Sequence, residues 1–308
     1  MKAIVAKDLT KIYRVRGRRI IAVNKLNLKI LEGEIFGLLG PNGAGKTTTI
    51  NLLLGLTSPT SGEAYVFGFD IVRDSVKIRE LAGLVPEKAG FYGSLTAYQN
   101  LKYFAELSGM PSSELDERIE WALKFVDLSG WRDVPVKAFS RGMVQRLALA
   151  RVLVRRPRII FLDEPTAGLD PKASRKYRLL IKKLNRDYGV TIVISSHMLH
   201  EVRRICHRIG FMKKGKIIST GRVEELLKKL KLRILIEVDQ LSSEILNEIK
   251  SLNGVLGIDK VRGNKVYLTA SRDLRLEISK ILIQRGVLIK TLKIVHPTLD
   301  ELFMQLNR

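Results

Sequence analysis

Residues 40–47 read GPNGAGKT and match the pattern G-x-x-x-x-G-K-[ST] of a phosphate-binding loop. The glycines allow the backbone to curl so that its N–H groups point at phosphate oxygens. The apolar segments EIFGLLG and TTINLLLGL flank the loop and predict a strand before it and a helix after it. We therefore expect Lys46 to contact the β- and γ-phosphates of a nucleotide, and the Thr47 hydroxyl to bind Mg²⁺. A glycine turn without a ligand is the alternative, and the flanking elements argue against it.

Two adjacent acids, Asp163 and Glu164, lie at the end of the apolar segment RIIFLDEP. Such a strand, buried on both faces, delivers them to the carboxyl edge of a parallel sheet, where α/β proteins bind ligands. Neighbouring carboxylates are costly unless a cation or a reaction uses them. We expect Asp163 to hold Mg²⁺ through water and Glu164 to polarise the attacking water.

His197 ends the next apolar segment, VTIVISSH, where it could sense the γ-phosphate; an ordinary hydrogen-bonded histidine is the alternative.

A second possible anion site lies at residues 139–143, FSRGM, where the helical segment MVQRLALARVL begins. Ser140 is a favourable helix N-cap, and the free N–H groups of a helix start suit an anion. Taken alone, the segment would be read as a plain serine-capped helix. Because the chain already has a phosphate loop, an anion at this second site would have to come from outside the chain.

Composition describes a folded globular chain of 308 residues with 28% charged residues and a net charge of +23. No segment approaches the roughly 18 apolar residues of a membrane span, and the N-terminus lacks the apolar run of a signal peptide, so we expect a cytosolic location. The single cysteine, Cys206, permits no internal disulfide.

The basic surface can be merely solvated or can face an anionic membrane surface. No nucleic-acid-binding motif accompanies the charge, so specific nucleic-acid binding is not expected.

Hydrophobic periodicity predicts an α/β fold. The first 85 residues alternate as β-strands do, and residues 96–155 have the pattern of helices. Buried strands then alternate with helices, which predicts a parallel sheet with crossover helices. We place a nucleotide-binding domain at residues 1–225, with a helical subdomain at about 88–155.

The C-terminal part, residues 226–308, is predicted to be a small α+β domain. Residues 232–295 have the order β-α-β-β-α-β, which resembles a ferredoxin-like sandwich. A charged helix near 222–232 is predicted to join the two domains, and a short helix, TLDELFMQLN, is predicted to follow the sandwich.

Taken in order, GPNGAGKTT, FSRGM, IIFLDEP, AGLD and SSH resemble the motifs of the ATP-binding subunit of ABC transporters, over roughly residues 1–225. The resemblance implies a P-loop NTPase cassette with a mixed β subdomain, a parallel-sheet core and a helical subdomain. It implies ATP and Mg²⁺ as cofactors. By position, the phosphate loop comprises Gly40, Pro41, Asn42, Gly43, Ala44, Gly45, Lys46, Thr47 and Thr48. The other positions implied are Tyr13 for adenine stacking, Ser140 and Gly142 for the signature, Asp163 for the magnesium site, Glu164 as catalytic base, Asp170 for the dimer-interface loop and His197 as switch.

The resemblance also implies partners. In this family two subunits pair head to tail, and each signature helix start faces the γ-phosphate held by the other subunit's phosphate loop. We therefore expect a homodimer, or a pair with another ATPase subunit, that closes on two ATP and opens after hydrolysis. A separate integral membrane permease is expected to bind near Glu87 and the segment KAGFYGSLTAYQN, which places the chain at the cytoplasmic face of a membrane.

Two positions depart from the family's usual pattern. Arg141 stands where the signature commonly has glycine, and it either adds charge near the partner's nucleotide or points at solvent. Glu87 stands where a glutamine usually lies near the metal; a carboxylate should bind Mg²⁺ more strongly but adds negative charge beside the γ-phosphate. These features and the C-terminal domain resemble the exporter-type branch of drug, sodium and antibiotic-resistance exporters. The alternative from another class is a soluble family member acting on the ribosome or nucleic acid, which the +23 charge motivates and the single cassette opposes.

Overall fold

The computed structural model describes residues 1–15, 17–222, 225–226 and 232–295. The chain divides into two compact units, residues 1–223 and 224–308, and each is described by itself. Most of the predicted helix at 222–232 and all of TLDELFMQLN fall outside the described residues.

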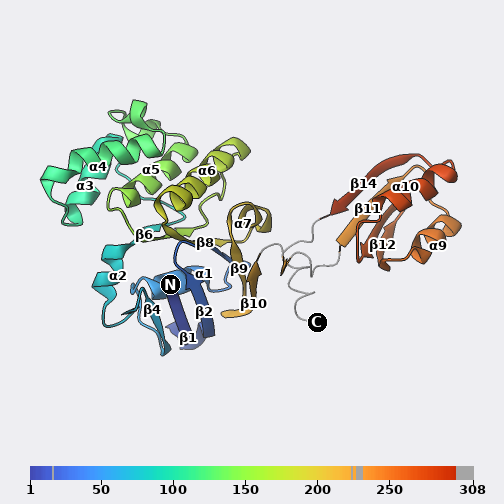
Figure 1. Ribbon diagram of the computed structural model, residues 1–308, viewed down its shortest axis with the longest axis horizontal. Helices are drawn as coiled ribbons and strands as arrows, with labels where there is room; N and C mark the ends of the chain where they lie inside the picture. The colour runs from blue at the N-terminus through green and yellow to red at the C-terminus, as the bar shows by residue number, and fades with distance from the viewer. Residues whose placement is uncertain (16, 223–224, 227–231, 296–308) are drawn as a thin grey trace. The chain divides into compact units, whose positions relative to one another are not determined.

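The first unit is built on a six-stranded sheet with the strand order β10-β9-β3-β8-β7-β6 (Figure 1). Its strands are β3 (Ile35–Leu39), β6 (Ala82–Val85), β7 (Ile159–Asp163), β8 (Thr191–Ser196), β9 (Arg208–Lys213) and β10 (Lys216–Arg222). All neighbours pair in parallel except β9 and β10, which form an antiparallel hairpin. Every residue of β3, β7 and β8 is buried, which confirms the predicted parallel core.

A second, antiparallel sheet has the order β2-β1-β4-β5. Its strands are β1 (Lys2–Val15), β2 (Arg18–Leu31), β4 (Ser61–Val66) and β5 (Phe69–Asp70). Apolar side chains of this sheet share one buried cluster with β3, β7 and the helix α1 (Lys46–Leu53). The phosphate loop therefore lies between β3 and α1, with both sheets supporting the surrounding core.

The helices α3 (Ala97–Leu107), α4 (Ser112–Phe125) and α5 (Arg141–Leu153) gather at one end of this unit, away from β1 and β2 (Figure 1). Thr96 and Gln99 form a capping box that starts α3. The crossover helix α6 (Pro171–Tyr188) ends at Gly189, whose φ of 65° is left-handed. The unit also contains the short helix α2 (Ser75–Leu81), the 3₁₀ turns η1 (Ser129–Trp131) and η2 (Val136–Ala138), and the helix α7 (Leu199–Ile205), which follows β8.

The second unit has the predicted β-α-β-β-α-β order. Its elements are β11 (Leu232–Val238), α9 (Ser243–Ser251), β12 (Val255–Arg262), β13 (Lys265–Ala270), α10 (Arg275–Gln284) and β14 (Ile289–Val295). The strands form an antiparallel sheet in the order β12-β13-β11-β14, and the two helices pack on a shared apolar core. This is the arrangement of a ferredoxin-like sandwich.

Candidate nucleotide-binding site

The phosphate loop has a backbone that requires glycine. Gly43 and Gly45 have φ angles of 78° and 101°, in the left-handed region. A Cβ atom at Gly45 would lie 2.2 Å from the carbonyl oxygen of Ala22, and one at Gly40 would lie 2.3 Å from that of Met212. The loop is therefore clamped against neighbouring backbone, and its shape cannot be kept by residues with side chains.

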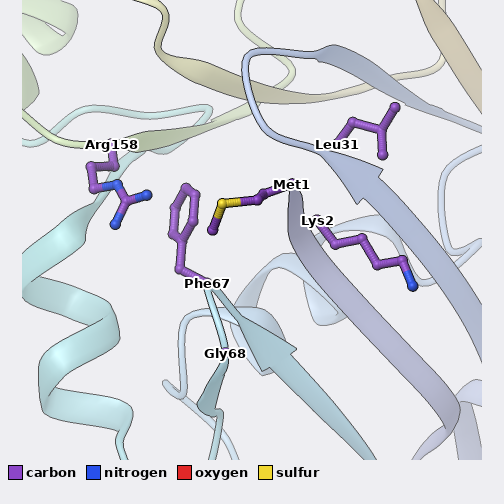
Figure 2. Close-up of a pocket in the computed structure, with 6 residues that line it drawn as sticks. All are labelled: Met1, Lys2, Leu31, Phe67, Gly68 and Arg158. Atoms are coloured by element: carbon purple, nitrogen blue, oxygen red, sulfur yellow. The ribbon is translucent and has the colours of Figure 1, made fainter.

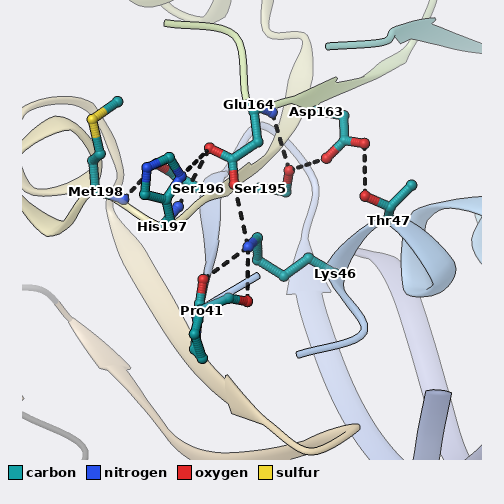
Figure 3. Close-up of polar contacts among 10 residues, drawn as sticks. Pro41, Lys46, Thr47, Asp163, Glu164, Ser195, Ser196, His197 and Met198 are labelled. Atoms are coloured by element: carbon teal, nitrogen blue, oxygen red, sulfur yellow. Dashed lines mark hydrogen bonds and ion pairs between the residues drawn. The ribbon is translucent and has the colours of Figure 1, made fainter. Parts of the chain in front are cut away.

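Lys46 lies at the centre of the site and is only 6% exposed. Its Nζ atom donates hydrogen bonds to the carbonyl oxygens of Gly40, at 2.8 Å, and Pro41, at 3.2 Å. The same atom is 3.2 Å from Oε1 of Glu164 (Figure 3). The ammonium group is thus already directed into the loop that would hold phosphates.

The carboxyl ends of β7 and β8 bring Asp163 next to Ser195, its partner in the strand register. One oxygen of Asp163 accepts a hydrogen bond from Ser195 Oγ, and the other accepts one from Thr47 Oγ1 at 2.8 Å. Thr47 belongs to the first turn of α1, so the contact joins the phosphate loop to the acidic strand end (Figure 3).

Glu164 follows Asp163 with a left-handed φ of 47°, unusual for a residue with a side chain. Its backbone N–H donates to the hydroxyl and the carbonyl oxygen of Ser195, each at 3.2 Å. Its Oε2 atom lies 2.9 Å from Nδ1 of His197. Oε1 is buried and pairs with Lys46, and among the described residues no group donates a hydrogen bond to it, so it is open to a further donor. The carboxylate therefore points into the site, held between a cation and a histidine.

These residues fit a magnesium–nucleotide complex. Mg²⁺ is usually held by one or two carboxylates together with substrate phosphates, and Thr47 and Asp163 supply adjacent oxygen atoms. Among the described residues no group of three or more acidic, histidine or cysteine side chains could hold a metal, so water and phosphate oxygens would complete the coordination.

In the described part of the chain, no hydrogen bond or ion pair joins Glu87 to this cluster. It is exposed, two residues beyond the end of β6. Tyr13 lies near the end of β1 and is 37% exposed as a residue, and Lys11 Nζ lies 5.0 Å from its ring centroid. Both residues stay predictions for metal and adenine binding respectively.

Ser140, Gly142 and Asp170 form a separate pair of helix starts. Ser140 caps α5 by accepting from Met143 N at 3.3 Å, and Asp170 caps α6 by accepting from Ala173 N at 2.9 Å. Within the part of the chain that the structure describes, no hydrogen bond or ion pair joins them to residues 40–48.

Arg141 is exposed, and its two expected positions, beside the partner's nucleotide or toward solvent, stay predictions. Its guanidinium lies against Gly168, where a Cβ atom would be only 2.1 Å from a terminal nitrogen. Gly168 belongs to the AGLD segment and has a left-handed φ of 67°. Arg141 therefore connects the start of α5 to that loop.

Sequence reasoning missed Ser195. The SSH motif was noted only for its histidine, yet Ser195 binds Asp163 and the backbone of Glu164. The adjacent Ser196 shapes the same turn, because its hydroxyl accepts from Met198 N at 2.9 Å (Figure 3). Two serines directly before a histidine at the end of a buried strand were the available signal.

A pocket of about 620 Å³ is lined by residues that include Arg158, directly before β7, and Leu31, the last residue of β2 (Figure 2). It therefore lies at the opposite end of β7 from Asp163. Arg158 lies over the Phe67 ring at 4.1 Å and pairs with Glu32 at 2.7 Å. Because its lining shares no residue with the cluster around Lys46, we assign it no part in nucleotide binding.

A phosphate loop between a parallel strand and a helix, with acids at the neighbouring strand end, defines a P-loop nucleoside triphosphatase. A family model described as "ABC transporter" matches residues 23–167. The uncharacterized ABC transporter ATP-binding protein YhcH of Bacillus subtilis (strain 168) is 34% identical over 100% of this chain and 97% of its own length. The chain therefore belongs to the ATP-binding proteins of ABC transporters, and it is an ATPase.

Two further relatives differ in what their names describe. The linearmycin resistance ATP-binding protein LnrL of B. subtilis (strain 168) is 30% identical over 98% of this chain and 97% of its own length. The methionine import ATP-binding protein MetN of Geobacillus kaustophilus (strain HTA426) is 36% identical over 71% of this chain and 66% of its own length.

Among solved structures, the dimeric post-hydrolysis state of the ATP-binding cassette MJ0796, bound to ADP and Pi, has a TM-score of 0.65 to this chain. It is 31% identical and covers 71% of this chain and 98% of its own. Among the helices in the described ranges, none has the length and apolar character needed to cross a membrane.

Proposed function

We propose that the chain closes as a head-to-tail dimer on two ATP and drives a separate membrane permease in the direction of export. One observation carries this proposal: the groups that could bind phosphate lie at two separate places in the chain. Lys46, Thr47, Asp163, Glu164 and His197 converge on one phosphate site. Among the described residues, no hydrogen bond or ion pair joins the helix start at Ser140 to that site.

Each residue of the converging cluster has a role that follows from its contacts. Lys46 binds the β- and γ-phosphates after leaving the loop carbonyls and Glu164. Thr47 and Asp163 hold Mg²⁺, which when bound neutralises phosphate charge. Glu164 accepts the proton of the attacking water, and His197 keeps its carboxylate oriented.

In the dimer, the partner subunit would supply an anion to the start of α5 at Ser140. The N-terminal N–H groups of a helix favour an anion, and the side chain of Ser140 adds a hydroxyl. A γ-phosphate held by a partner's phosphate loop satisfies both, so ATP joins the two subunits and its hydrolysis releases them. The ADP- and Pi-bound dimer of MJ0796 supports this geometry.

The permease would dock on an aromatic cluster formed by the exposed Tyr92 and Tyr103 and the partly buried Phe91 and Phe104. Tyr92 is 50% exposed, and its ring lies 5.2 Å from that of Tyr103. The buried Asn100 fixes the backbone of this loop, since it accepts from Tyr92 N and donates to the carbonyl oxygens of residues 92, 95 and 96. A rigid loop with exposed rings, next to Glu87, suits a protein partner.

Docking on a permease would hold the chain at the cytoplasmic face of a membrane. The export direction is supported by LnrL, a resistance protein that aligns with nearly the whole of this chain, whereas the import protein MetN aligns with 71% of it.

The test is the Glu164→Gln variant. It should keep ATP binding, hydrolyse ATP at least about a hundredfold more slowly and accumulate as an ATP-bound dimer, because the amide cannot accept the proton. Sedimentation with ATP and a phosphate-release assay measure both effects. Turnover equal to that of the wild type would rule out the role of Glu164.

A second experiment identifies the partner. The tagged chain is recovered from its own cells in mild detergent, with and without nuclease, and the bound proteins are identified by mass spectrometry. A multi-span membrane protein that survives nuclease is expected. Ribosomal proteins or nucleic acid that disappear with nuclease would contradict the transport function.

A further inference from the structure

The helix that follows His197 is short and is held by contacts on two sides. α7 has seven residues, too few to be stable without tertiary contacts. Its Val202 packs on Gly37 of β3, where an added Cβ atom would lie only 2.4 Å from a Val202 methyl carbon. Its Glu201 is buried and pairs with Arg178 of α6. Because neighbouring residues of a helix point about 100° apart, the two contacts fix α7 in different directions.

The pair of Arg178 and Glu201 is withdrawn from water. Each side chain is only 9% exposed. Nη1 of Arg178 donates to both carboxylate oxygens, at 2.7 Å to Oε1 and 2.5 Å to Oε2, and Nε2 of the exposed His200 lies 3.3 Å from Oε1. Burying two charges has a desolvation cost that apolar side chains of similar volume would avoid. Stability alone therefore does not account for this pair.

The helix that the pair holds begins directly after the histidine of the site. Nδ1 of His197 lies 2.9 Å from Oε2 of Glu164 (Figure 3). Met198 is the N-cap of α7, and its N–H donates to Ser196 Oγ at 2.9 Å, so the connection between β8 and α7 is tight. A rotation or shift of α7 would therefore move His197 relative to Glu164.

We propose that Arg178 and Glu201 are positioning residues for ATP hydrolysis. Their ion pair fixes the rotation of α7 and thereby holds the imidazole of His197 against the carboxylate of Glu164. This rests on the proposed function, because it requires Glu164 to accept the proton of the attacking water and His197 to orient it. In the described part of the chain, no hydrogen bond or ion pair joins Arg178 or Glu201 to the phosphate loop, so both act through α7.

The test removes both charges at once in the full chain. Arg178→Met/Glu201→Met replaces the pair with unbranched apolar side chains, a kind of change that is often neutral or stabilising. The matched control is Glu34→Met/Arg208→Met. That pair is also buried on its acidic side, with Glu34 6% exposed, and it joins the amino ends of β3 and β9 at 3.1 Å. The kcat, the KM for ATP and the melting temperature are measured for both variants.

The methionine pair at 178 and 201 should lower kcat about tenfold and leave the KM for ATP within about twofold, because displacing a catalytic group by about 1 Å can cost up to about 100-fold. Its melting temperature should stay at or above that of the wild type. The control should keep its kcat within about twofold of the wild type.

A second measurement asks whether the pair acts through the histidine. In a His197→Ala chain, adding Arg178→Met/Glu201→Met should change kcat by less than about twofold, because the group that the pair positions is already gone. If the methionine variant does not fold, Glu201→Asp decides instead. It keeps the charge and shortens the side chain, so it should lower kcat where Glu34→Asp does not.

Two results would overturn the proposal. One is a kcat equal to that of the matched Glu34 variant, and the other is a full further loss of kcat in the His197→Ala chain. The proposed function fails separately, if Glu164→Gln and His197→Ala both hydrolyse ATP at the wild-type rate. Slow hydrolysis by those two variants, together with unchanged kcat of Arg178→Met/Glu201→Met, would remove only the positioning role.

Discussion

At the scale of single residues, the site depends on how Glu164 is held. Its left-handed backbone costs about 1–3 kcal/mol and persists because the surrounding contacts fix it. Ser195 supplies two of those contacts and also binds Asp163. The acids themselves could be predicted from RIIFLDEP, since polar residues ending an apolar strand are visible in the sequence. Ser195 could not, because its role depends on the register that pairs it with Asp163 across two strands.

Ser195→Ala should lower the rate of ATP hydrolysis about tenfold or more while ATP still binds. The change removes a hydrogen bond to a carboxylate, a kind worth about 1.5–3 kcal/mol, and one that fixes the Glu164 backbone. Steady-state hydrolysis and nucleotide titration measure the two effects. Ser174→Ala, another buried serine substitution, should hydrolyse at nearly the parent rate. A Ser195→Ala rate equal to that of Ser174→Ala would show that Ser195 does not position the acids.

At the scale of elements, the strongly periodic segments were predictable. The strands β7 and β8 are uninterrupted apolar runs, and α6 combines an amphipathic pattern with a glycine C-cap. The hairpin of β9 and β10 and the helix α2 were not predicted. The hairpin is rich in lysine, which is poor in strands, and α2 has only seven residues, too few for a clear period.

Two serine helix caps allow the effect of a cap on stability to be measured apart from its effect on dimerisation. Ser140→Ala should lower the free energy of unfolding by about 1 kcal/mol through loss of the α5 cap, and should also weaken ATP-driven dimerisation. Ser242 caps α9 with the same 3.3 Å geometry, so Ser242→Ala should cost similar stability in its own unit and leave dimerisation unchanged. Denaturant unfolding and sedimentation with ATP are the measurements. If both variants dimerise equally well with ATP, Ser140 acts only as a helix cap and has no part in dimerisation.

At the scale of the whole molecule, the described residues include two apolar cores that share no residue. One joins both sheets of the first unit, and the other is confined to the second unit. The order of elements in the second unit was predictable from its alternating patterns. The strand order β12-β13-β11-β14 depends on long-range pairing, which the alternating patterns alone do not specify.

Separate cores predict two thermal transitions, only one of which responds to nucleotide. In the Glu164→Gln variant, ATP with Mg²⁺ should raise the transition of residues 1–223 by mass action and leave the other in place. Leu268→Ala, which truncates a fully buried side chain of the second core, should lower only the nucleotide-independent transition, by about 2–5 kcal/mol of unfolding free energy. Differential scanning calorimetry resolves the two. A single transition that shifts as a whole with ATP would show that the units unfold together.

The ion pair between Lys46 and Glu164 bears on product exchange. The structure pairs the lysine that is expected to bind phosphate, at 3.2 Å, with the carboxylate that is expected to activate water. A nucleotide must therefore displace Glu164 from Lys46 in order to bind. Once phosphate has left, we expect the ion pair to form again and to compete with the remaining ADP, so this carboxylate should also promote the release of ADP. A Glu164→Gln chain would then retain nucleotide for two reasons: slow hydrolysis, and an amide that no longer competes for the lysine.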